Sequence, residues 1–288
     1  MNSEKKIGIL MLIPSIILIV FFVSYPTVMT FYYSLTNYNV VKGVADFIGL
    51  TNYISLITDS KLSNSFLRTI IFVSITVLLS MSIGIFMAIL TYECQTGKKI
   101  FTALFSVPLA IPFVIIGVAF KFMLSYDMGI VNQILESLGI GRIPFYSSGD
   151  LALLATVIAD SWWGSSFTFL VVYSGFESIS HSLIEAAYID GASTFELYKS
   201  ILLPLSKRHV ITALLFRIID AFRAFDHVYV MTAGGPGEAT QYLSIYVSKV
   251  AFDYFNLGYA CALAVVLLFA LSILAQILFK TFIPRRTK

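Results

Sequence analysis

Six long apolar runs dominate this chain of 288 residues and leave it few possible folds. Each run has about the length that an α-helix needs to cross a bilayer, roughly 20 residues. Because a backbone in lipid must satisfy its own hydrogen bonds, we expect every run to be helical. Pro108 and Pro112 should kink the third one. The predicted spans are residues 7–24, 66–92, 100–124, 151–176, 209–231 and 257–282.

The composition excludes an ordinary water-soluble domain. Charged residues make up 12% of the chain and hydrophobic residues 58%, whereas soluble domains carry about 25% charged residues. The formal net charge of +3 is too small to indicate a nucleic-acid partner. Six spans also leave no room for a separate catalytic domain. We therefore predict an all-α, polytopic protein with six transmembrane helices in a lipid bilayer.

The first apolar run resembles a secretory signal because Lys5 and Lys6 precede it. It is longer than the about 7–15 residues typical of a signal and has no A-x-A cleavage site, so we predict a retained first span. We divide the chain into three parts. They are the first span with an outer loop (1–64), a membrane domain with helices 2–6 (65–283) and a cytoplasmic tail (284–288).

The distribution of basic residues predicts the orientation. An even number of spans places both termini on one side of the membrane, and cytoplasmic loops are enriched in Lys and Arg. The opposite loops hold only Lys42, Lys61, Arg142 and Lys249. The side of the termini holds Lys5, Lys6, Lys98, Lys99, Lys199, Lys207, Arg208, Lys280, Arg285, Arg286 and Lys288. Both termini are therefore expected in the cytoplasm.

The loop 177–208, between the fourth and fifth spans, contains the most informative sequence, EAAYIDGASTFELYKSILLP. Asp190-Gly191 is a turn signal, and Ser193 followed by Glu196 forms a capping box that starts a helix. Pro204 should end the element. The pattern predicts two short helices joined by a sharp bend, too polar to span a membrane. Such an element either docks on a partner or merely reverses the chain.

This loop resembles the EAA loop of permease subunits of bacterial ABC importers, where EAA is followed by three residues, Gly, nine residues, Ile, one residue and Leu-Pro. The matching residues are Glu185, Ala186, Ala187, Gly191, Ile201, Leu203 and Pro204. The likeness extends to the carbohydrate-importer permeases related to the larger membrane subunit of the maltose importer. It covers segments 47–57, 106–124, 129–140 and 213–240. Because the chain lacks a large outer insert, it is similar to the compact six-span members.

The resemblance implies a type I permease fold with a cytoplasmic EAA coupling helix between helices 4 and 5. It also implies a second permease subunit forming a heterodimer, two cytoplasmic ATPases and an extracytoplasmic binding protein that delivers a sugar. Glu185 through Gly191, with Asp190 in the bend, would insert into an ATPase cleft. The chain has no G-x-x-x-x-G-K-[ST] motif. ATP and Mg are therefore expected on the ATPases, with no cofactor and no enzyme activity on this chain.

Charged residues recur at every third position of the fifth predicted span, at Arg217, Asp220, Arg223 and Asp226. Neighbours at this spacing share a helix face and can pair, and charges in a membrane usually face the bundle interior or a water-filled cavity. They are interpreted either as a polar lining of the sugar pathway or as a self-neutralising ladder that joins helices or the partner permease together. The sequence favours the ladder slightly.

The fourth span carries Asp160 and Ser161 followed by Trp162 and Trp163. An aromatic plane beside polar groups suits the apolar face of a sugar, although tryptophan also anchors helices at membrane interfaces. No metal site is predicted, since the histidines and cysteines lack metal-binding spacing. They are His181, His209, His227, Cys94 and Cys261.

Three rival functions remain beside a sugar importer permease in a bacterial cytoplasmic membrane. A permease for a non-sugar solute would share the EAA loop. An autonomous secondary carrier would leave that loop unexplained, and the chain shows no internal repeat of the kind such carriers use. An intramembrane enzyme would need a nucleophile with its base or a metal cluster, and neither is evident in the sequence.

Overall fold

A computed structural model describes residues 3–43, 45–94 and 96–282, with side chains for 11–43, 45–94 and 96–280. Most of these residues are helical, and no strand occurs among them beyond two isolated β-bridges. This agrees with the predicted all-α class. The chain forms two compact units, 1–62 with 247–272 and 63–246 with 273–288. The predicted domain boundaries stay predictions, and the tail 284–288 lies outside the described residues.

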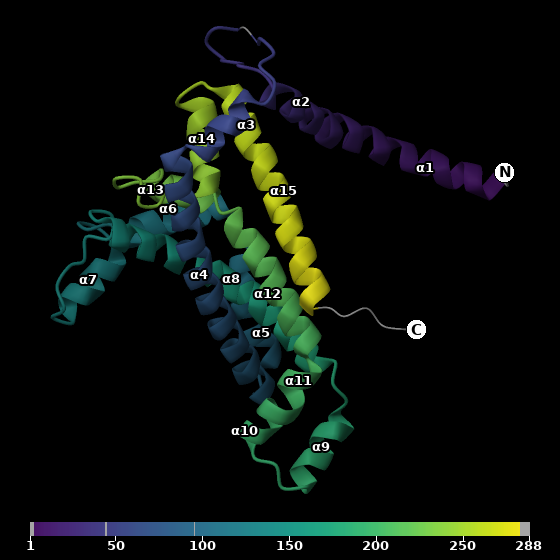
Figure 1. The fold of residues 1–288 in the computed structure, drawn as a ribbon. Coiled ribbons are helices and arrows are strands. Elements are labelled where there is room, and N and C mark those ends of the chain that lie inside the picture. Colours follow the sequence, from purple (N-terminus) through teal and green to yellow (C-terminus); the bar gives the residue numbers. More distant parts are fainter. Residues whose placement is uncertain (1–2, 44, 95, 283–288) are drawn as a thin grey trace. The chain divides into compact units, whose positions relative to one another are not determined.

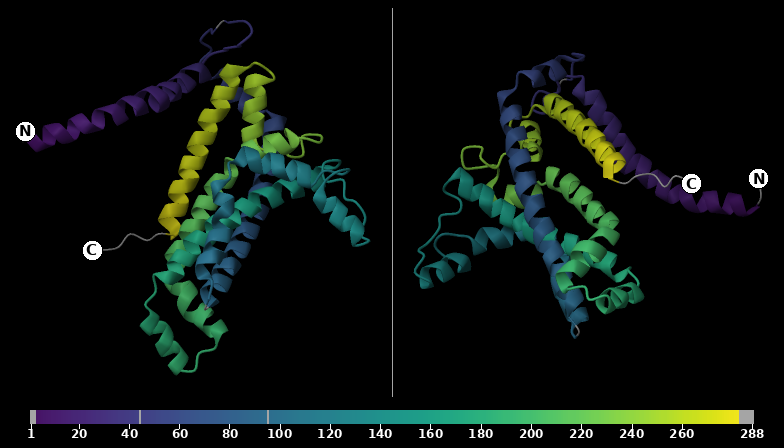
Figure 2. Two further views of the ribbon diagram at one scale, coloured as in Figure 1. Left: turned by 180° about the vertical axis from the view of Figure 1, so that it is seen from behind. Right: turned by 60° about the horizontal axis from the view of Figure 1, so that its bottom comes forward.

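The first unit is formed by the N-terminal apolar run, an outer loop and the beginning of the last helix (Figures 1 and 2). The Asn52 side chain donates hydrogen bonds to the carbonyls of Ser34 and Thr36 at 2.9 and 2.8 Å. These bonds fix the loop that follows the first span. The elements are α1 (Ser3–Ile19), the π-helix η1 (Val20–Ser24), α2 (Tyr25–Ser34), α3 (Thr51–Ile57) and the first part of α15 (Leu257–Phe282).

The second unit holds the central helices and the loop between the fourth and fifth predicted spans. Figure 1 shows α9 and α10 at one end of this unit and α13 toward the other, while α7 extends to one side. Its elements are α4 (Ser60–Glu93), α5 (Lys98–Ser106), η2 (Val107–Ala110), α6 (Phe113–Met123), α7 (Ile130–Ser137), α8 (Gly149–Glu177), α9 (His181–Ile189), α10 (Thr194–Leu197), η3 (Tyr198–Leu202), α11 (Leu203–Leu205), α12 (Lys207–Phe222), α13 (Asp226–Thr232) and the first part of α14 (Leu243–Phe252).

Within the described residues, three helices are long and apolar enough to cross a membrane. They are Met11–Ser34, Ser60–Glu93 and Leu257–Lys280. A fourth candidate is the pair Lys98–Ala110 and Phe113–Met123, which is bent by 97°. The bend lies at the two prolines of the third predicted span, so the expected kink is confirmed.

The remaining two predicted spans are more polar. Helix α8 has 29 residues, but it buries several hydroxyl side chains and Asp160, which lower its hydropathy. The predicted fifth span is broken, because α12 ends at Phe222 and α13 begins at Asp226. The break leaves Arg223 and Asp226 exposed. Uninterrupted helix would have held these charges along one face at membrane depth, which is costly without partners.

Helices α4 and α8 approach each other closely at Gly84. A Cβ atom at this position would lie 2.5 Å from the Thr168 Cβ and 2.6 Å from the Ser165 carbonyl oxygen. Small residues allow such backbone contact between membrane helices, where dispersion forces and hydrogen bonds replace the hydrophobic effect. The α4–α8 contact therefore positions the polar side chains of both helices.

Gly84→Ala is expected to destabilise the protein by about 1–3 kcal/mol, because the added methyl group meets backbone that cannot move aside. The measurement is the free energy of unfolding in detergent, with Ser82→Ala on the exposed side of the same helix as the control. Equal stability of the two variants would show that the close approach is not required.

Candidate functional site

The loop between α8 and α12 forms the two short helices and sharp bend that the sequence predicts. Helix α9 ends in a Schellman motif, in which Gly191 N–H bonds the Tyr188 carbonyl and Ala192 N–H bonds the Ala187 carbonyl, at 3.1 and 3.0 Å. Gly191 has φ +84°, a conformation that glycine adopts without strain. We call residues 181–205 the α9–α10 hairpin.

Helix α10 starts with the predicted capping box. Ser193 N–H donates to Glu196 Oε2 at 2.8 Å, and Glu196 N–H donates to Ser193 Oγ at 3.3 Å. Pro204 lies in the one-turn helix α11, which ends at Leu205, so the element ends one residue after the proline and before α12, close to the expected position. The π-helix η3 directly precedes this proline segment. Its altered hydrogen-bond register accommodates a residue without an N–H, so the chain stays helical.

The capping box makes the start of α10 sensitive to acid. Hydrogen bonds from the Ser193 backbone N–H and hydroxyl lower the pKa of Glu196 below its ordinary value of 4.5. Because this pKa is lowered, the capping box contributes fully to the stability of α10 above pH 4.5. This contribution is lost as the pH falls through the pKa that Glu196 has in the folded protein. We expect amide exchange of α10 to accelerate only below pH 4.5. Glu196→Gln should remove this pH dependence, and an unchanged profile would contradict the assignment.

The motif residues divide between an internal and an external face. Ala187 belongs to a buried cluster with Phe176 and Leu197, and Ile201 and Leu203 pack against it. The other motif residues are exposed at the surface of the hairpin, and two apolar neighbours are exposed with them, Ile189 by 85% and Phe195 by 73%. The exposed motif residues are Glu185, Ala186, Asp190, Gly191 and Pro204.

Tyr198 connects the hairpin to the end of α4. Its hydroxyl donates to Glu93 Oε1 at 2.7 Å. Burial, and then the hydrogen bond to this carboxylate, raise the pKa of Tyr198 above its usual value. The same buried cluster holds Phe169 of α8 and Ala213 of α12. The hairpin is therefore packed against α4, α8 and α12.

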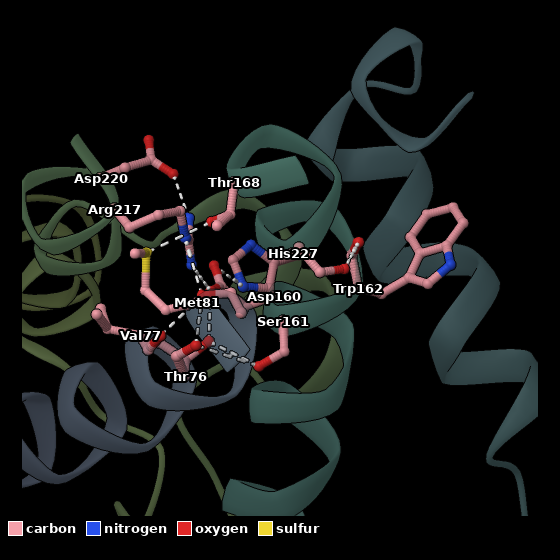
Figure 3. A network of polar contacts seen from close by, with 12 residues as sticks. Thr76, Val77, Met81, Asp160, Ser161, Trp162, Thr168, Arg217, Asp220 and His227 are labelled. Carbon is pink, nitrogen blue, oxygen red and sulfur yellow. Dashed lines mark hydrogen bonds and ion pairs between the residues drawn. The ribbon is translucent and has the colours of Figure 1, made fainter. Parts of the chain in front are cut away.

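A second candidate site surrounds Arg217, whose side chain is fully buried. Its guanidinium contacts Asp160 of α8 through Nη2, Asp220 through Nη1 at 3.0 Å and Ser80 of α4 through Nε at 3.2 Å. Thr76 donates a further hydrogen bond to Asp160 at 2.6 Å. Figure 3 shows Thr76, Asp160 and Arg217 converging from three helices.

A cavity of about 200 Å³ adjoins this network. Phe113 lies at its wall, with its ring centroid 4.6 Å from that of Trp163 and 5.4 Å from that of His227. Trp162 points away from the network (Figure 3), and its ring centroid lies 5.8 Å from that of Phe120. The lining residues are Phe113, Asp160, Asp220, Arg223, Ala224, Phe225, Asp226 and His227.

Three of the predicted pathway charges thus line one cavity, while Arg217 lies behind it and joins helices. The sequence reasoning missed Thr76, Ser80 and His227. Hydroxyl residues one turn apart in an apolar run were the available signal for the first two. Among the described residues, no three His, Cys, Asp or Glu side chains are arranged to hold a metal ion.

Comparisons with known proteins identify the family of this chain. The family model described as "binding-protein-dependent transport system inner membrane component" matches residues 80–288. The trehalose/maltose transport system permease protein MalF of Thermococcus litoralis is 37% identical over 255 residues, covering 88% of this chain and 85% of that protein. The sulfoquinovosyl glycerol transport system permease protein SmoG of Agrobacterium fabrum is 33% identical over 274 residues, covering 94% and 88%.

A solved structure confirms the predicted permease fold. It is a bacterial ABC transporter involved in the import of the acidic polysaccharide alginate, one chain of which matches with a TM-score of 0.87 at 19% identity. The match covers 99% of this chain and 98% of that chain. This chain therefore belongs to the family of binding-protein-dependent transport system inner membrane components, and its relatives include permease subunits of sugar ABC transporters.

Proposed function

We propose that this chain is one permease subunit of an ATP-driven sugar importer in a bacterial cytoplasmic membrane. It would contribute six spans, with both termini in the cytoplasm, and half of the translocation pathway. The proposal rests mainly on the α9–α10 hairpin. It exposes Glu185 and Gly191, while its buried residues pack against α4, α8 and α12. Permease relatives of trehalose/maltose transport support a sugar as the substrate.

In this proposal the hairpin couples the membrane helices to a partner ATPase. Glu185 is its polar anchor, and Ile189 and Phe195 supply exposed apolar contacts. ATP and Mg bind to the ATPases, whose closure pulls the hairpin as one rigid element. Because Tyr198 and Ala187 link it to α4 and α8, the helices follow and the pathway opens outward.

The remaining partners follow from the same scheme. A second permease subunit, expected to be a different chain, completes the pathway. Two ATPase subunits dock in the cytoplasm, and an extracytoplasmic binding protein delivers the sugar. The cavity beside Arg217 is the segment of pathway that this chain supplies, with Asp220, Arg223 and Asp226 as its hydrogen-bonding groups and Phe113 as its aromatic wall. Trp163 packs against Phe113 and does not line the cavity.

Site-specific photocrosslinking tests the docking directly. A photoreactive amino acid at Ile189, which is 85% exposed at the end of α9, should crosslink to the ATPase in the assembled complex. The matched control is Leu138, which is 68% exposed just after α7 and is expected on the opposite side of the membrane. Crosslinking from Leu138 instead of Ile189 would overturn both the docking site and the orientation.

A further inference from the structure

We propose that a cavity at the start of α5 binds the headgroup of an anionic phospholipid. The cavity measures about 460 Å³, within the roughly 300–1,000 Å³ typical of small-molecule sites. It lies against α5 and α8 and shares no lining residue with the cavity beside Arg217. The residues that line it are Lys98, Lys99, Thr102, Ala103, Ser106 and Tyr173.

One face of α5 forms most of the cavity wall. Lys98, Thr102 and Ser106 follow one another at intervals of four residues and therefore share one side of the helix. Lys99 and Ala103 are also four residues apart and lie beside them. The two lysines begin the helix, so both ammonium groups are at the same end of the cavity.

The Lys98 side chain is held at the cavity by two other helices. Its Nζ atom lies 4.8 Å from the ring centroid of Tyr92 in α4 and 3.7 Å from Glu177 Oε1 in α8. The side chains of Lys98 and Glu177 are 36% and 41% exposed, and ion pairs this open to solvent contribute little to stability. A phosphate oxygen can therefore compete with Glu177 for this ammonium group.

The charge of the site matches one phosphodiester. Lys99 is exposed, and no described residue forms an ion pair with it. The carboxylate of Glu93, at the end of α4, accepts a hydrogen bond from Tyr198 instead. Two ammonium groups against the single carboxylate of Glu177 leave one positive charge, which a phosphodiester with one negative charge would balance.

The hydroxyl groups of the lining act as acceptors. Thr102 donates its hydroxyl proton to the Lys98 carbonyl at 2.8 Å, and Ser106 donates its own to the Thr102 carbonyl at 2.6 Å. Their oxygens can still accept hydrogen bonds. An ionised phosphodiester has no proton to offer them, whereas the hydroxyls of a glycerol headgroup do. Among anionic phospholipids the lining therefore favours phosphatidylglycerol.

The position of the cavity favours a lipid over a soluble phosphate. Lys98 is the first residue of the bent apolar helix pair that is a candidate membrane span. Beside the cavity, Ile100 and Leu104 are 72% and 59% exposed and form an apolar stripe that acyl chains would contact. Basic pockets between membrane helices bind anionic headgroups in this way on the cytoplasmic side, which is the side that the proposed orientation assigns to the start of α5.

Native mass spectrometry of the purified, delipidated chain tests the proposal through the affinity for the first bound lipid. The probes are dioleoylphosphatidylglycerol and dioleoylphosphatidylcholine, which share acyl chains and differ in headgroup. We expect phosphatidylglycerol to bind at least tenfold more tightly. Lys98→Gln with Lys99→Gln should remove this preference, because each basic residue at an anionic headgroup contributes roughly fivefold. The matched control, Lys207→Gln with Arg208→Gln, removes the same charge outside the cavity and should keep the preference.

A cavity-filling variant separates a built site from general attraction between charges. Ala103 is exposed in the cavity wall, so Ala103→Trp should fold normally by circular dichroism and still weaken phosphatidylglycerol binding at least tenfold. Equal losses in the two double variants, or a preference that survives Ala103→Trp, would overturn the proposal. Displacement of the lipid by millimolar inorganic phosphate would also overturn it and identify a site for soluble phosphates. These measurements use neither ATP nor sugar, so their failure is distinct from failure of the proposed function.

Discussion

Replacing Arg217 with methionine is expected to destabilise the folded protein by about 3–5 kcal/mol. The guanidinium is the partner of Asp160, and both side chains are almost completely buried. Removing one member of a buried ion pair leaves the other charge uncompensated, and this loss far exceeds the net contribution of the pair itself. Asp220 would lose its partner as well. The measurement is the free energy of unfolding of the purified chain in detergent.

Two comparisons make this prediction specific. Arg223→Met removes an exposed guanidinium from the same segment and should change stability by no more than about 0.5 kcal/mol. The double variant Asp160→Leu with Arg217→Met should recover most of the loss, because apolar side chains replace the buried pair. If Arg217→Met is as stable as Arg223→Met, the network does not hold the helices together.

The second large effect is expected at the bend of the hairpin. Gly191→Pro should reduce sugar-stimulated ATP hydrolysis by roughly 100-fold, which corresponds to about 3 kcal/mol. Proline fixes φ near −65°, whereas this position has φ +84°. The substitution also removes the N–H that bonds the Tyr188 carbonyl. The hairpin would then lose the shape in which its exposed residues meet the ATPase.

Gly191→Asn is the matched control. Asparagine tolerates positive φ better than other non-glycine residues, and a Cβ at this position would meet no atom within 4 Å. This variant should therefore keep most of the coupling. Equal losses in both variants would mean that the side chain, and not the backbone conformation, matters at this position.

The sequence predicts the features that depend on neighbours in the chain. The capping box of Ser193 and Glu196, the bend at Gly191 and the kink at the two prolines of the third span all form as expected. Each is determined within about one helical turn. The exposed and packed faces of the EAA motif appear only in the structure, because they depend on which helices the hairpin meets.

The polar network around Arg217 could not be predicted from local sequence patterns, because its contacts join residues that are far apart in the chain. Thr76 lies 84 positions from Asp160, and Asp160 lies 57 from Arg217. A regular spacing of three suggested a ladder along one helix, but Arg217 pairs with another helix as well, and the chain breaks before Asp226. Nothing in a single sequence specifies such pairings. The sequence does show polar residues within apolar spans. Because isolated polar groups are costly in a membrane, such residues indicate that partners exist without identifying them.

ATP-dependent uptake of labelled sugar into proteoliposomes tests the central claim most directly. The vesicles would contain this chain with its partner permease and ATPases, with the binding protein on the side opposite the ATPases. The account predicts that one sugar accumulates against its gradient only when ATP, the ATPase and the binding protein are all present. It also predicts that Gly191→Pro abolishes this accumulation. Sugar flux that persists without any ATPase and ignores the substitution would contradict the account and identify an autonomous carrier.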